Sequence, residues 1–160
     1  MPLASFSPPL FYRLFFLWIE PLSTVVGAYW AHFLPTTYIQ LTHAASAPAS
    51  DSLLPLSTRI VLSQLANLYF LFTLNEALVL RSTDDIRVWR TLLFGLLIAD
   101  FGHLYSIYTL GIDIYWSISK WNAIDWGNIA FVYAGALTRI SFLLGIGLSK
   151  RQMDDKSKVN

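Results

Sequence analysis

The sequence of 160 residues contains no cysteine. That absence excludes disulfide bonds, thiolate metal ligands and cysteine nucleophiles. The chain also has no Asn-x-Ser/Thr acceptor for N-glycosylation, and charged residues make up only 13% of it. Because the formal net charge is +1, the composition gives no general attraction to nucleic acid, and we expect no nucleic-acid partner.

Apolar surface is what the chain has in abundance, with 55% hydrophobic residues, 16% aromatic residues and a mean hydropathy of +0.51. A small soluble domain cannot bury that much apolar surface. A hydrocarbon layer of about 30 Å takes about 20 helical residues to cross. Four stretches have that length, namely residues 11–34, 58–80, 87–110 and 124–148. We therefore predict an all-α fold, a four-transmembrane-helix bundle in one domain over residues 1–160, with the lipid bilayer as its partner and residues 149–160 as a solvated tail.

The basic residues are distributed unevenly between the two faces that four spans imply. The face that holds both termini and the turn 81–87 carries most of them: Arg13, Arg81, Arg87, Arg90, Lys150, Arg151, Lys156 and Lys158. Only Arg59 and Lys120 fall on the other face. By the positive-inside rule both termini are cytoplasmic, and we expect a multi-pass protein of the endoplasmic reticulum. The loop 35–57, rich in Ser, Ala, Thr and Pro, should be irregular.

Each span carries one polar stripe when it is drawn as a helix of 3.6 residues per turn. Ionisable groups inside a bilayer cost about 2.5–3.5 kcal/mol each, so these stripes should face the bundle interior. The polar members are Arg13, Glu20, Ser23 and Thr24 in the first span, Gln64, Asn67, Asn75 and the neighbouring Glu76 in the second, Asp100 and His103 in the third, and Asp125, Asn128 and Arg139 in the fourth. The third span has a second stripe suited to close helix packing, made of Gly95, Ala99, Gly102 and Ser106.

Depth along the antiparallel spans sorts the polar residues into two layers. Glu20 and Arg139 lie at one depth and are natural ion-pair partners, with Glu76 close enough to join them. A second layer should hold Asn67 and Asp100, with His103 and Gln64 about one turn away. Both layers have two interpretations, a structural network that fixes helix register or a reactive site. We expect no metal and no cofactor, because one histidine among scattered carboxylates lacks the dense ligand spacing of zinc or di-iron bundles.

Four segments carry a family resemblance: YRLFFLWIEPLSTVVGAYWA, LANLYFLFTLNEALVLRSTDD, ADFGHLYSIY and DWGNIAFVYAGALTRISFLLG. Together they resemble a largely uncharacterised family of small four-span integral membrane proteins of filamentous fungi, some of them encoded within secondary-metabolite gene clusters. In size and number of spans the chain is more distantly similar to the emopamil-binding and sterol-isomerase-like bundles. The intramembrane acids of those bundles serve isoprenoid chemistry.

The leading hypothesis is a membrane enzyme of isoprenoid or meroterpenoid secondary metabolism, a cyclase or isomerase that protonates an alkene or epoxide of a hydrophobic small-molecule substrate. Asp100, assisted by His103, is the first choice of proton donor, and Glu20 and Glu76 are the second. Residues expected to contact the substrate are Asn67, Asn75, Arg139, Asn128, Asp125, Tyr105 and Tyr133. The alternative is a non-catalytic four-helix membrane scaffold, a lipid or sterol binder or a small carrier; either protein is compatible with a homo-oligomer.

Overall fold

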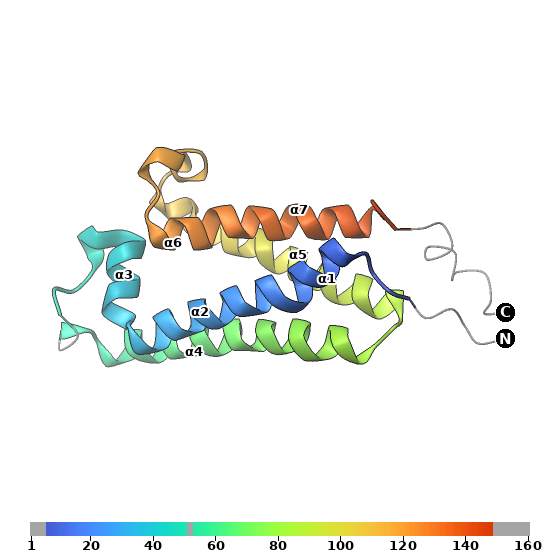
Figure 1. The fold of residues 1–160 in the computed structure, drawn as a ribbon. Helices are drawn as coiled ribbons and strands as arrows, with labels where there is room; N and C mark the ends of the chain where they lie inside the picture. The colour runs from blue at the N-terminus through green and yellow to red at the C-terminus, as the bar shows by residue number, and fades with distance from the viewer. Residues whose placement is uncertain (1–5, 51–52, 149–160) are drawn as a thin grey trace, which may run out of the picture.

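The computed structural model describes residues 6–50 and 53–148, which form an all-α bundle of long helical rods lying side by side (Figure 1). The solvated tail expected at 149–160 lies outside the described residues. The first rod joins α1 (Leu10–Leu14), η1 (Phe15–Ile19) and α2 (Glu20–Phe33). The second rod joins α4 (Leu56–Leu74), η4 (Asn75–Val79) and η5 (Leu80–Ser82). The third joins α5 (Ile86–Ser106) and η6 (Ile107–Leu110). The fourth joins α6 (Ala123–Asp125), η9 (Trp126–Phe131) and α7 (Val132–Leu143).

The rods form two pairs, since α2 packs mainly against α4 and α5 mainly against α7. A core rich in aromatic rings joins the pairs at the end of the bundle where the described residues begin and finish. Its buried members are Phe6, Tyr12, Phe15, Phe16, Leu80, Ile86, Trp89, Leu93, Leu96, Phe142 and Leu148.

Local signals in the sequence set several helix ends. Asp85 caps α5, accepting a hydrogen bond from the Arg87 backbone N–H at 2.7 Å, and this bond lowers the pKa of the Asp85 carboxyl. Asn122 and Asp125 form a reciprocal capping box at the start of α6. Gly111 ends the third rod with a φ of 100°, a left-handed conformation that glycine adopts without strain.

The loop expected to be irregular contains a helix, so that prediction is wrong over its first part. Helix α3 (Pro35–His43) begins at Pro35, which lacks the N–H that a first helical turn leaves unbonded. Short 3-10 segments follow, among them η2 (Ala44–Ser46). Tyr38 of α3 is buried in a small second core with Ala31, Leu62 and Ala66 of the α2–α4 pair. Tertiary packing of Tyr38 thus stabilises a helix that the composition of the loop does not indicate.

Three of the rods contain a π-helical segment, η1, η4 and η9. Pro21 explains the first of them, because it has no N–H to donate to the Leu17 carbonyl one turn earlier. That carbonyl accepts a hydrogen bond from the Arg81 guanidinium instead. Segments of this kind are frequent at functional sites. Here Glu20 directly follows η1, Glu76 lies in η4, and Asn128 lies in η9.

The surface of the bundle is unusually apolar. Large apolar side chains such as Phe11, Leu22 and Leu137 are more than 60% exposed, whereas Glu20, Glu76 and Arg139 are buried. Two rods, Leu10–Phe33 and Ile86–Leu110, are long and apolar enough to cross a membrane. The other two fall short of that measure because polar side chains lower their mean hydropathy.

The small-residue stripe on α5 does not pack as we expected. Gly95 and Gly102 are exposed, and a Cβ built on either of them would meet nothing within 4 Å in the described structure. Helix α7 packs against α5, and the buried Leu93 and Leu96 of α5 share a hydrophobic core with Phe142 of α7. The prediction of close helix packing along this stripe is therefore wrong within the described chain.

Candidate functional site

One guanidinium and three carboxyl groups meet in the middle of the bundle, and we call Glu20, Glu76, Asp100 and Arg139 the Arg139 cluster. Arg139 Nη1 donates to Asp100 Oδ2 at 2.6 Å, and Nη2 donates to Glu76 Oε1 at 3.1 Å. Nη2 also donates to Glu20 Oε1. Each residue comes from a different rod, so the cluster ties the two helix pairs together. The predicted ion pair between Glu20 and Arg139, with Glu76 joining it, is confirmed.

The cluster is enclosed by protein. The Arg139 side chain is 3% exposed, and its guanidinium carbon lies 5.9 Å from the centre of the Phe16 ring. Gly135, one turn before Arg139, gives the guanidinium its space, because a Cβ there would lie 2.8 Å from Nη1 and 3.4 Å from Glu20 Oε1. Arg139 Nε, Glu20 Oε2 and Glu76 Oε2 are buried without a hydrogen-bond partner among the described residues. The polar side chains of the cluster are therefore tightly packed, but not all of their buried polar atoms have hydrogen-bond partners.

The charges of the cluster do not balance. One guanidinium can compensate one carboxylate, and the cluster contains three carboxyl groups. Burying uncompensated charge is costly, so neutrality here requires protons on the remaining carboxyl groups. The arrangement can therefore hold protons away from water and can release them to a group that approaches it.

A cavity of about 740 Å³ lies between the two helix pairs, within the size range of small-molecule sites. Its wall is mainly apolar, and the Arg139 cluster borders it through Glu20, Asp100 and Arg139. Several of its apolar lining residues are also exposed on the outside of the bundle, namely Ile19, Leu22, Val26 and Trp126. The cavity therefore opens sideways between α2 and η9, through a rim of apolar side chains.

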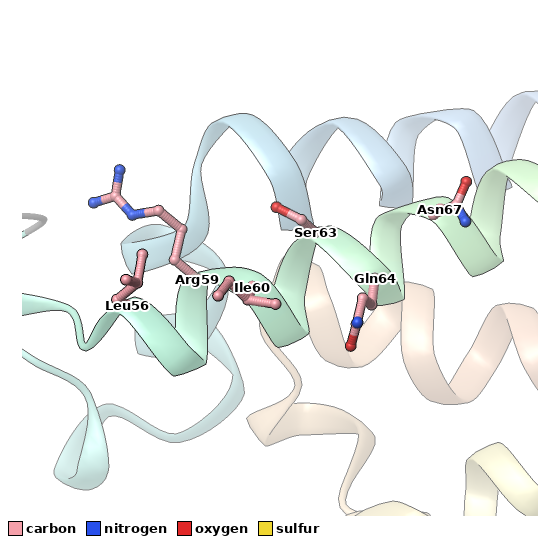
Figure 2. A pocket seen from close by; sticks show the side chains of 6 residues that line it. All are labelled: Leu56, Arg59, Ile60, Ser63, Gln64 and Asn67. Carbon is pink, nitrogen blue, oxygen red and sulfur yellow. The ribbon is translucent and has the colours of Figure 1, made fainter.

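The second polar layer that we predicted does not form. Asn67 and Gln64 are exposed on the outer side of α4, and Asp100 binds Arg139. An outer pocket of about 370 Å³ is lined by Leu56, Arg59, Ile60, Ser63, Gln64 and Asn67 (Figure 2). All six belong to α4, so this pocket is a feature of one helix surface and no other rod encloses it. Helical periodicity placed Gln64 and Asn67 on one stripe but could not tell which way that stripe faces.

His103 lies in the cavity wall one turn beyond Asp100, close to the backbone of Asn128. Its Nε2 is buried without a hydrogen-bond partner among the described residues. Asn128 lines the cavity from η9. The structure thus brings Asp100, His103, Glu20, Arg139 and Asn128 to one cavity, and Glu76 lies behind them with no exposed surface.

The remaining residues predicted to contact substrate lie elsewhere. Asp125 is occupied by the capping box of α6, where it accepts a hydrogen bond from the Asn122 N–H at 3.0 Å. Tyr133 donates to the Tyr115 carbonyl at 3.2 Å, and Tyr105 is 80% exposed on α5. Asn75 is half-buried at the start of η4 and is not part of the cavity wall.

Two features of the site escaped the sequence prediction. Tyr38 and Tyr69 both line the cavity, and their hydroxyl oxygens are 3.1 Å apart in a hydrogen bond. Tyr38 lies in the segment expected to be irregular, so no helical face pointed to it. Gly135 lies one turn before Arg139 on the same helical stripe. A small residue at that spacing from a buried arginine was the only sequence signal for the space that the guanidinium needs.

Within residues 6–50 and 53–148, no group of three or more His, Cys, Asp or Glu side chains is arranged to hold a metal ion. Fold and site together define an all-α protein with two candidate membrane-spanning helices and a buried guanidinium–carboxyl cluster beside a cavity. The chain belongs to a family described as a domain of unknown function, DUF7704, whose model matches residues 5–149. No curated protein and no solved structure matches it.

Proposed function

We propose that this protein is an integral membrane enzyme of isoprenoid or meroterpenoid metabolism, a cyclase or isomerase that protonates its substrate inside the bundle. The observation that carries the proposal is the contact between the cavity and the Arg139 cluster. Glu20 and Asp100 belong both to the cavity wall and to a buried group of carboxyls that outnumber their guanidinium. An apolar cavity bordered by shielded protons is what alkene or epoxide protonation requires.

We further propose that all four rods cross the bilayer, with both termini on the cytoplasmic side of the endoplasmic reticulum. Exposed apolar side chains and a buried ionic cluster support this arrangement, since it reverses the pattern of a soluble protein. Arg13, Arg81 and Arg87 are exposed near the end of the bundle that holds residues 6 and 148. That distribution agrees with the positive-inside rule. Substrate would enter from the lipid through the rim between α2 and η9.

Asp100 is the best-placed acid of the cluster. Its side chain is 14% exposed and borders the cavity, whereas Glu76 has 1% exposure and does not reach the cavity wall. Protonation of a double bond by Asp100 would leave a carbocation, and loss of a proton from a neighbouring carbon to a cluster carboxylate would complete an isomerisation. Trp30, Tyr69 and Phe131 line the same cavity, and aromatic rings of this kind can stabilise positive charge.

A non-catalytic membrane scaffold or lipid binder is the alternative, and one observation favours it. Arg139 binds carboxyl groups from three other rods, which is also how a purely structural network would fix helix positions. In that case the cavity would hold a lipid or sterol without changing it.

The deciding experiment compares products formed in a strain that lacks the gene with those formed after adding back the wild-type gene or a variant. Asp100→Asn keeps the size of the side chain but cannot donate a carboxyl proton, so we expect product to fall by about 100-fold or more. Asn67→Leu is the matched control, because Asn67 is exposed on α4 outside the cavity, and product should persist. Undiminished product from Asp100→Asn at normal protein level would contradict the proposal.

A further inference from the structure

Two sets of polar groups line the cavity at different positions along the bundle. The charged end consists of Glu20, Asp100 and Arg139, and the neutral end consists of Tyr38, Tyr69 and Asn128. The other polar lining residues are Ser23 and Thr24, within one turn of Glu20, and His103, one turn from Asp100. Tyr69 packs on Gly27, where a Cβ would lie 3.4 Å from Tyr69 Cδ2. Because Gly27 follows Glu20 by seven residues of helix, the two ends are about 10 Å apart.

The neutral end can bind an uncharged oxygen. Tyr38 and Tyr69 share one hydrogen bond, and a pair of hydroxyls has two protons, so one O–H and several lone pairs remain for a ligand. Asn128 adds an amide with two N–H donors and a carbonyl acceptor, and η9 holds it against the cavity. A ligand hydroxyl or carbonyl would meet both donors and acceptors there.

Neither end is suited to an anion. Arg139 is the only lysine or arginine among the lining residues, and it already binds three carboxyl groups. The other arginines with hydrogen bonds to described partners are engaged elsewhere: Arg81 with the Leu17 carbonyl, Arg87 with Asp85 and Arg90 with the Leu143 carbonyl. A phosphate at either end would lose its hydration without gaining an unpaired lysine or arginine.

We infer that the ligand of this cavity is an uncharged amphiphile with a hydroxyl or carbonyl oxygen, a prenyl or terpenoid alcohol or ketone, and not a prenyl diphosphate. The oxygen binds at the neutral end, and the apolar body extends to the charged end. The part of this inference that concerns the substrate rests on the proposed function, because it places the reacting double bond beside Asp100, about 10 Å from the ligand oxygen. As a statement about binding it can be measured without turnover.

The test measures binding of three probes to the full chain in lipid nanodiscs: farnesol, farnesyl diphosphate and a farnesene hydrocarbon. Tryptophan fluorescence reports occupancy, since Trp30 and Trp126 line the cavity. We expect farnesol to bind about tenfold or more tighter than either other probe, which corresponds to about one hydrogen bond of difference. Equal or tighter binding of the diphosphate, or no binding of farnesol, would overturn the inference.

Two variants test whether the ligand oxygen binds at the neutral end of the cavity. Tyr69→Phe combined with Asn128→Leu should reduce the preference for farnesol over the hydrocarbon to about twofold or less, because both remove polar groups of the neutral end. Tyr105→Phe, which changes a tyrosine 80% exposed on α5, should leave the preference unchanged. A preference that survives in the double variant would show that the oxygen binds elsewhere.

Failure of this inference and failure of the proposed enzyme are separable. Asp100→Asn should retain the preference for farnesol while losing product. A wild-type chain that binds farnesol selectively but forms no product would refute only the enzyme. Product formed from a diphosphate substrate and lost in Asp100→Asn would refute only the ligand class.

Discussion

Replacing Gly135 by alanine tests whether the Arg139 cluster stabilises the protein. The new Cβ would lie 2.8 Å from Arg139 Nη1, closer than real Cβ atoms approach other atoms, so the guanidinium must move. Nη1 is the nitrogen that donates to Asp100 Oδ2 at 2.6 Å, so this is the bond that we expect such a movement to weaken or break. Gly102→Ala on α5 is the matched control, because a Cβ there meets nothing within 4 Å.

The size of the effect follows from comparing the two alanine variants. Each replaces a glycine inside a helix, so each gains about 0.5–1 kcal/mol from helix propensity, and that gain cancels in the comparison. The remaining difference in unfolding free energy between the two variants is the loss of the Arg139–Asp100 bond, and a hydrogen bond to a charged group contributes about 1.5–3 kcal/mol. For a chain of this length that free energy corresponds to a difference of about 3–12 °C in unfolding temperature.

The assay is thermal unfolding of both purified variants in the same detergent, followed by circular dichroism. Gly102→Ala should unfold slightly above the wild-type temperature, and Gly135→Ala should unfold below it. Equal unfolding temperatures for the two variants would refute the argument that Gly135 is needed for the guanidinium to reach its partners.

Two further predictions concern Arg139 and Asp85. Arg139→Met leaves three buried carboxyl groups without their guanidinium, so the free energy of unfolding in detergent should fall by about 3–5 kcal/mol, and a change within experimental error would show that the ion pairs are energetically unimportant. Asp85 has a lowered pKa because the Arg87 backbone N–H bonds to its carboxylate, so its stabilising contribution is present above its ordinary pKa and disappears as pH falls through the lowered value. Asp85→Ala should therefore lower the unfolding temperature more at about pH 7 than in acid that protonates the carboxyl, and an equal loss at both would rule out a contribution from the charge of the cap.

Much of the helical framework could be predicted from the sequence. Apolar stretches of membrane-crossing length located the long rods, and the structure has helices over each of them. Matching depth identified Glu20 and Arg139 as partners, because ionisable residues in an apolar chain need opposite charge at the same level. The caps at Asp85 and in the Asn122–Asp125 box obey short-range capping rules, but those rules do not select Asp85 over the neighbouring Ser82, Thr83 and Asp84, which are also suitable N-caps.

Depth and periodicity could not assign every partner. Asp100 and Asn67 lie at similar predicted depth, yet Asp100 binds Arg139 and Asn67 is exposed on the far side of α4. A helical stripe specifies which residues share a face, but its direction depends on how the rods rotate against one another. That rotation is fixed by long-range packing, such as the approach of Gly27 to Tyr69 and the hydrogen bond of 2.8 Å between Thr24 and Thr73.

The sequence by itself determined that this chain is helical and apolar, with a few ionisable groups that require partners inside it, because composition and periodicity are properties of the chain alone. Only the tertiary structure decided that three carboxyl groups converge on Arg139 and that a cavity lies beside them. Convergence of four rods depends on side chains far apart in sequence, including a glycine that leaves room for a guanidinium. Such complementarity exists only once the rods have packed.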